Sequence, residues 1–125
     1  MAKGVVLVVD DDQDARLVLS ARLRKQEFDC VFAGDCYQAL CVARQQKPVA
    51  ILLDLHLPAG DGYMVLERLK AMPALSSIPV VVVSSDDREK AEAKALGAGA
   101  VAYLEKPVGD ESLKAALQTA LASGA

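Results

Sequence analysis

The sequence has 125 residues, 53% of them hydrophobic and 25% charged, and its formal net charge is −3. This length predicts a single domain that can bury a core without disulfide or metal staples. The acidic balance disfavours direct binding to nucleic acids, which usually requires a basic face. No apolar run approaches the roughly 20 residues of a membrane span, and no signal peptide is recognisable. We therefore expect a cytoplasmic protein that does not bind membranes.

Five apolar runs along the chain predict five strands. Three of the runs are unbroken and rich in β-branched residues, which suits strands that are buried on both faces of a parallel sheet. The runs cover residues 5–9, 30–33, 49–53, 80–83 and 101–104.

Each run is followed by apolar residues at helical spacing, which predicts five helices. These stripes begin at Ala15, Ala39, Val65, Ala91 and Leu113. Pro73 should stop the third helix, and Gly97 or Gly99 should stop the fourth. Strictly alternating strands and helices indicate an α/β fold, in which right-handed crossovers place helices on both faces of a parallel sheet. We expect one doubly wound (βα)5 domain with its core at about residues 3–121 and no output domain.

Binding sites in such folds form beyond the carboxyl ends of the strands. These ends carry polar and charged side chains in four of the five predicted strands. The first strand ends in Asp10-Asp11-Asp12, the third in Asp54, the fourth in Ser84-Ser85, and the fifth leads to Lys106-Pro107. Carboxylates, a hydroxyl and an ammonium should therefore meet at one edge of the sheet.

This combination has a chemical logic. Carboxylates that lie close together raise one another's pKa unless a cation neutralises them. Mg²⁺ suits a site with a few carboxylates, several waters and a phosphate oxygen. A carboxylate held in such a site can attack phosphorus and form an aspartyl phosphate. The metal, a lysine and a hydroxyl would stabilise the charge on the transferred group.

The sequence resembles response-regulator receiver domains over roughly residues 3–121. The matching segments are VLVVDD at 6–11, LDLHLP at 53–58 with Asp61-Gly62, PVVVVS at 79–84, and AYLEKP at 102–107. The resemblance implies a flavodoxin-like sheet with strand order 2-1-3-4-5. It also implies a signalling switch that catalyses only its own phosphorylation and dephosphorylation, and is otherwise not an enzyme.

The resemblance implies a role for each residue of the acidic edge. Asp54 stands at the phosphoacceptor position and would also contact the metal. Asp10 and Asp11 match the acidic pair that holds Mg²⁺, with Asp11 the more direct ligand and Asp10 acting partly through water. The backbone carbonyl of His56 falls at the position of a further metal ligand.

The remaining matched residues would sense the phosphoryl group. Ser84 matches the switch hydroxyl that turns towards it, and Lys106 matches the lysine that contacts it. Tyr103 matches the aromatic residue that moves between outward and inward rotamers. Pro107 follows a peptide bond that is cis in this family, at a position where proline makes the cis form accessible.

The sequence departs from the family pattern beside the acceptor. Methionine is common where Leu57 and Gly60 stand, and Gly60 predicts a looser turn over residues 59–62. His56 and Asp86 occupy the two variable positions that flank the phosphorylation site. We expect these two residues to help set the lifetime of the phosphoryl group.

Each segment taken alone also has a simpler structural explanation. Asp10-Asp11-Asp12 could be a helix N-cap with acids in the first turn, where the helix dipole favours them. Asp54 could be a turn residue before Pro58, Ser84 could cap the next helix, and Lys106 could be a solvated surface residue.

Two other functions stay open. Asp10-x-Asp12 after an apolar strand resembles the nucleophile motif of haloacid-dehalogenase-type phosphatases, although Gln13 replaces their usual glycine. Phosphorylation at Asp10 rather than Asp54 would identify such an enzyme. The second alternative is a receiver-fold interaction module that takes no phosphate.

The resemblance also implies partners. A histidine kinase or histidine phosphotransfer protein would supply the phosphoryl group, and a downstream protein target would bind the surface of the fourth helix, fifth strand and fifth helix. The sequence leaves open the cognate kinase, the phosphoryl lifetime, the oligomeric state, and whether the domain stands alone or was cut from a larger protein.

Overall fold

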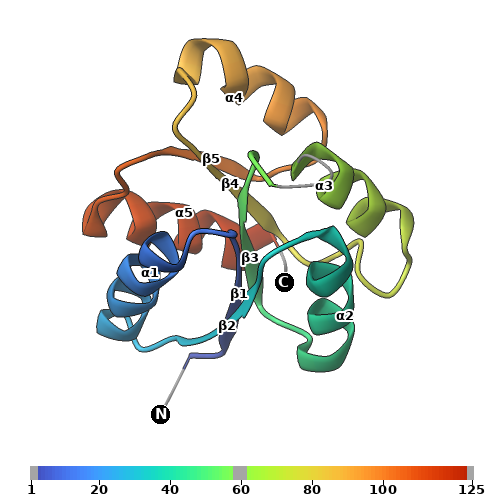
Figure 1. Cartoon of the computed structure of the whole chain (residues 1–125), viewed down its shortest axis with the longest axis horizontal. Helices are drawn as coiled ribbons and strands as arrows, with labels where there is room; N and C mark the ends of the chain where they lie inside the picture. Colours follow the sequence, from blue (N-terminus) through green and yellow to red (C-terminus); the bar gives the residue numbers. More distant parts are fainter. Residues whose placement is uncertain (1–2, 58–61, 124–125) are drawn as a thin grey trace.

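The computed structural model describes residues 3–57 and 62–123, in which strands and helices alternate along the chain (Figure 1). The strands are β1 (Val5–Val9), β2 (Asp29–Ala33), β3 (Ala50–Asp54), β4 (Val80–Ser84) and β5 (Ala102–Glu105). The helices are α1 (Gln13–Lys25), α2 (Cys36–Gln46), α3 (Gly62–Ala71), α4 (Arg88–Gly97) and α5 (Asp110–Ser123). The strands form one parallel sheet in the order β2-β1-β3-β4-β5, which confirms the predicted doubly wound fold.

The core lies on both faces of this sheet. Along each central strand, alternate side chains join two separate apolar clusters, as the two-residue period of a strand requires. One cluster packs beneath α2, α3 and α4, and the other beneath α1 and α5. Figure 1 shows α1 and α5 together on one side of the sheet and α2 and α3 on the other. Because both faces are covered, the central strands read as unbroken apolar runs.

The element boundaries differ from the predicted ones by a residue or so. β3 and β4 extend to include Asp54 and Ser84, so both polar residues are the last residues of a strand. α3 ends at Ala71, two residues before the predicted stop at Pro73, because proline disfavours helical dihedrals in the residue that precedes it. α4 ends at Gly97, one of its two expected stops. Within the described ranges, every helix is too short or too polar to cross a membrane.

Candidate functional site

Three aspartates meet at the carboxyl ends of β1 and β3. One carboxylate oxygen from each of Asp10, Asp11 and Asp54 lies within 4.8 Å of the other two. Asp10 and Asp54 are buried, with 2% and 6% of their surface exposed, whereas Asp11 is exposed. These are hard oxygen donors at the carboxyl end of the sheet, and they suit a divalent cation such as Mg²⁺.

Asp54 is held from two sides. Its Oδ1 accepts a hydrogen bond of 2.9 Å from the backbone N–H of His56, and its Oδ2 lies 3.4 Å from Nζ of Lys106. Burial raises the pKa of Asp54 above its ordinary value, although the His56 N–H and the Lys106 ammonium act in the opposite direction. The carboxylate therefore lacks enough compensating positive charge, which a bound cation would supply.

Lys106 supplies the positive charge inside the cluster. Its Nζ lies 3.1 Å from Oδ2 of Asp10, and the Lys106–Pro107 peptide bond is cis. Burial opposes the charged ammonium, but the hydrogen bond to Asp10 and the charge of Asp54 outweigh it and raise the pKa of Lys106. Three carboxylates against one ammonium leave a formal charge of −2, which a divalent cation would balance.

The N-cap of α1 is Asp12, and neither of the two preceding aspartates serves as the cap. The side chain of Asp12 accepts a hydrogen bond of 3.0 Å from the N–H of Asp14. The N–H of Asp12 in turn donates to Oδ1 of Asp10 at 2.9 Å. The simpler explanation of the acidic run as a helix start therefore applies to its last member only.

The two predicted switch residues contact the same residue. Oγ of Ser84, which is fully buried, accepts a hydrogen bond of 3.0 Å from the N–H of Asp86. The hydroxyl of Tyr103 donates to the carbonyl oxygen of Asp86 at 3.0 Å, and the ring is only 3% exposed. Tyr103 thus has the inward orientation, and one peptide segment of the β4–α4 loop connects it to Ser84.

A family model for the response regulator receiver domain matches residues 6–118. The chain belongs to this family. KdpE, the KDP operon transcriptional regulatory protein of Escherichia coli, is 38% identical over 93% of this chain, which spans 50% of KdpE. PilH of Pseudomonas aeruginosa is 32% identical over 94% of this chain, which spans 97% of PilH.

Solved structures show the same similarity. The receiver domain of the sensor histidine kinase PA1611 from Pseudomonas aeruginosa superimposes with a TM-score of 0.86 and 28% identity, over 97% of this chain and 99% of that one. That structure has a magnesium ion coordinated in its active-site cleft. The chain is therefore a receiver domain of two-component signalling.

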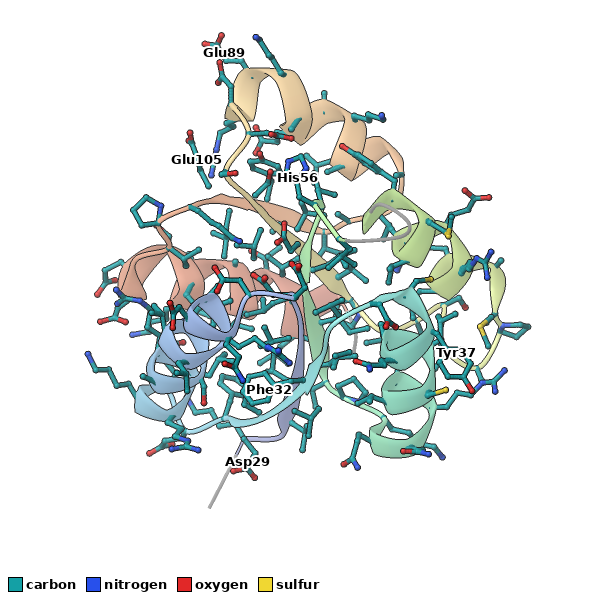
Figure 2. All side chains as sticks on the ribbon, in the orientation of Figure 1. Asp29, Phe32, Tyr37, His56, Glu89 and Glu105 are labelled. Carbon is teal, nitrogen blue, oxygen red and sulfur yellow. The ribbon has the colours of Figure 1, made fainter. Side chains whose placement is uncertain are left out.

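The receiver's site has a polar rim made of His56 and Asp86, for which the sequence predicted separate roles but no contact. Nε2 of His56 lies 2.9 Å from Oδ1 of Asp86, and both side chains are partly exposed. Figure 2 shows His56 beside the segment that leads into α4. The contact joins the segment after β3 to the β4–α4 loop, beside the strand ends that carry Asp54 and Ser84. The predicted looser turn around Gly60 lies outside the described residues, because residues 58–61 are not among them.

Two further residues shape the receiver's site without having been assigned a role from the sequence. A Cβ at Gly62 would lie 2.5 Å from the carbonyl oxygen of Asp54, so only glycine lets α3 start this close to β3. Gly62 belongs to a segment that resembles the family pattern, but its close approach to the backbone of Asp54 depends on the fold. Arg88 reaches from α4 to the carbonyl oxygen of Tyr103 at 3.1 Å, although it stands in a run of charged residues of the kind that usually forms a solvated helix face.

Proposed function

We propose that this receiver domain accepts a phosphoryl group on Asp54, with Mg²⁺, from the phosphohistidine of a histidine kinase or histidine phosphotransfer protein. The observation that supports this most directly is the placement of Asp54. Its buried carboxylate lies within 4.8 Å of two other carboxylates, and it also faces the Lys106 ammonium at 3.4 Å. A carboxylate in this setting combines a nucleophilic oxygen with a site for a charge-neutralising cation.

The donor set fits Mg²⁺. The carboxylates of Asp10, Asp11 and Asp54 and the backbone carbonyl of His56 would hold the ion, with Asp11 the most accessible of the three acids. When bound, Mg²⁺ would neutralise negative charge on the carboxylates and on the oxygens of the incoming phosphoryl group.

The residues of the chain account for the rest of the transfer. An oxygen of Asp54 forms a bond to phosphorus while the phosphorus–nitrogen bond of phosphohistidine breaks, and the electron pair of that bond stays on the imidazole. The N–H of His56 fixes the orientation of the Asp54 carboxylate. The ammonium of Lys106 lies beside the same carboxylate and would stabilise the equatorial phosphoryl oxygens.

The switch would follow from the shared contact at Asp86. The hydroxyl hydrogen of Ser84 can donate to a phosphoryl oxygen, since in this structure its oxygen acts as the acceptor for the Asp86 N–H. When Ser84 turns towards a phosphoryl oxygen, Tyr103 would fill the space that it vacates with its hydroxyl on the Asp86 carbonyl, so phosphorylation would favour the inward orientation. The orientation of Tyr103 would in turn shift the surface of α4, β5 and α5 between two conformations, and a downstream protein would bind to this surface. Hydrolysis of the aspartyl phosphate, assisted by the domain itself, would return the switch to its unphosphorylated state. We place this cycle in the cytoplasm.

The direct test is the intact mass of the protein after incubation with acetyl phosphate, with and without Mg²⁺, beside an Asp54→Asn control. We expect a Mg²⁺-dependent gain of one phosphoryl group in the wild type and none in the control. A gain that persists in Asp54→Asn would contradict the proposal and favour Asp10 as a phosphatase nucleophile. If neither acetyl phosphate nor a phosphorylated histidine phosphotransfer protein adds mass, the domain is an interaction module instead.

A further inference from the structure

Arg88, the first residue of α4, covers the ring of Tyr103. Its guanidinium carbon lies 5.7 Å from the ring centroid, and its Nη2 donates to the carbonyl oxygen of Tyr103 at 3.1 Å. We propose that Arg88 is a positioning residue that holds Tyr103 in its inward orientation and thereby biases the receiver towards the state that phosphorylation favours. The second half of this inference rests on the proposed function.

The two contacts of Arg88 act on different parts of Tyr103. The hydrogen bond to the backbone carbonyl anchors the guanidinium to β5 whichever way the ring points. The contact with the ring face, in contrast, is made by the inward ring and would be lost if the ring turned outward. Only an interaction that differs between two states can shift their populations. The ring contact, a cation over an aromatic face, is therefore the part that favours the inward rotamer.

The guanidinium also faces a second residue, Glu92. Its Nη1 lies 3.6 Å from Oε2 of Glu92, one helical turn further along α4. One terminal nitrogen therefore faces Glu92 while the other binds the Tyr103 carbonyl. Lysine, with a single ammonium, cannot make both contacts and present a flat face to the ring. The arrangement is specific to arginine at this position.

Arg88 completes a continuous series of contacts from the acceptor site to α4. Ser84 binds the N–H of Asp86, the Asp86 carbonyl binds the Tyr103 hydroxyl, and Arg88 binds Tyr103. An inward Tyr103 keeps this series intact. If phosphorylation and Arg88 favour the same rotamer, each must strengthen the other by the same factor, because coupling between sites is reciprocal.

The rotamer of Tyr103 can be measured by ¹⁹F NMR on protein labelled with 3-fluorotyrosine. The chain has three tyrosines, and single Tyr→Phe variants assign their signals. Tyr37, which points outward from α2 and is 78% exposed, serves as the reference for a solvated ring (Figure 2). Broadening by a soluble gadolinium chelate then reports the exposure of Tyr103.

In Arg88→Met, which keeps an extended apolar side chain, the outward-to-inward ratio of Tyr103 should rise about tenfold, equivalent to about 1.4 kcal/mol. Arg88→Lys should give an intermediate rise. Glu92→Gln removes only the charge of an exposed ion pair and keeps an oxygen that can accept from Nη1, so both contacts of Arg88 with Tyr103 remain and the ratio should change little.

The inference is overturned if the Tyr103 signal of Arg88→Met keeps the wild-type position and broadening. It is also overturned if the signals of Tyr37 and Tyr63 change as much as that of Tyr103, because Arg88 would then support the fold in general. Selective exposure of Tyr103 supports it.

Phosphorylation of the same variants separates this inference from the proposed function. With acetyl phosphate and Mg²⁺, Arg88→Met should reach a lower phosphorylated fraction by intact mass than Glu92→Gln. If Tyr103 becomes exposed in Arg88→Met but the wild type takes up no phosphoryl group, the positioning role stands and the acceptor role fails. If the wild type is phosphorylated but Tyr103 stays buried in Arg88→Met, the acceptor role of Asp54 stands and the positioning role of Arg88 fails. Exposure of Tyr103 without any change in phosphorylation would overturn the coupling.

Discussion

Replacing Asp54 with asparagine should stabilise the receiver in the absence of Mg²⁺, although it removes the proposed acceptor. Two unit charges at 4.8 Å repel by about 3.5 kcal/mol at an effective dielectric constant of about 20. Asp10 and Asp11 together would then oppose the charge of Asp54 by about 7 kcal/mol, while Lys106 at 3.4 Å offsets about 5 kcal/mol. The remaining repulsion is about 2 kcal/mol at this limiting separation, and the screening of the exposed Asp11 lowers its share.

The pH dependence has a defined sign. Burial raises the folded-state pKa of Asp54, so the folded protein binds more protons than the unfolded chain between the two pKa values. The stability of the wild type should therefore fall as the pH rises through that window. The advantage of Asp54→Asn should be fully present above the folded pKa and should vanish well below about pH 3.9, the ordinary value for aspartate.

Mg²⁺ should reduce the stability advantage of Asp54→Asn over the wild type. A cation present at about 100 times its Kd stabilises the folded state by about 2.7 kcal/mol, which exceeds the repulsion in the wild type. Asp54→Asn lacks one of the three carboxylates and should gain less.

Urea unfolding followed by far-UV circular dichroism, at pH 7 with EDTA or with Mg²⁺, measures both effects. Asp11→Asn is the comparison: it removes an exposed acid of the same cluster, whose charge is screened, and should stabilise the protein less in EDTA than Asp54→Asn. The reasoning is refuted if Asp54→Asn is no more stable than the wild type in EDTA, or if Mg²⁺ stabilises both proteins equally.

Three further predictions address packing and the rim of the site. Leu66→Ala, at a fully buried position, should lower the unfolding free energy by about 2–5 kcal/mol in urea. Gly62→Ala should lower it by about 1–3 kcal/mol and also reduce phosphoryl uptake by intact mass, because its Cβ would lie 2.5 Å from the carbonyl oxygen of Asp54; unchanged uptake would count against this tight approach. His56→Ala and Asp86→Ala should each change the dephosphorylation rate in the same direction and by a similar factor, since each breaks the same 2.9 Å contact. Wild-type decay in both variants would remove any role of this pair.

The fold could be predicted because the sheet is covered on both faces. Residues such as Leu52 and Leu53 face opposite sides of the sheet and are both buried, so the strand appears as an unbroken apolar run. The same pattern places the strand ends to within a residue, and with them Asp54 and Ser84. The end of α3 does not follow from the apolar pattern alone. The apolar stripe continues to Met72, but Pro73 disfavours helical dihedrals at Met72 and the helix ends at Ala71.

The contacts at the rim could not be predicted in the same way. His56 and Asp86 lie 30 positions apart and meet through the conformations of two loops, which no hydrophobic periodicity encodes. Arg88 stands in a run of charged residues, where the default expectation is a solvated helix face. Its contact with Tyr103 requires the start of α4 to lie close to β5, and this depends on tertiary packing.

The run Asp10-Asp11-Asp12 shows why residue type alone does not assign function. Asp10 is buried and pairs with Lys106, Asp11 is exposed at the cluster, and Asp12 caps α1. Each environment follows from position, because the chain leaves a buried strand at Asp10 and has its first helical residue three positions later. The first carboxylate therefore needs a charged partner in the protein, the second remains accessible to a cation, and the third satisfies a free backbone N–H of the helix. On this argument Asp12→Ala should weaken α1 without abolishing Mg²⁺ binding, whereas Asp11→Ala should weaken Mg²⁺ binding and leave α1 intact.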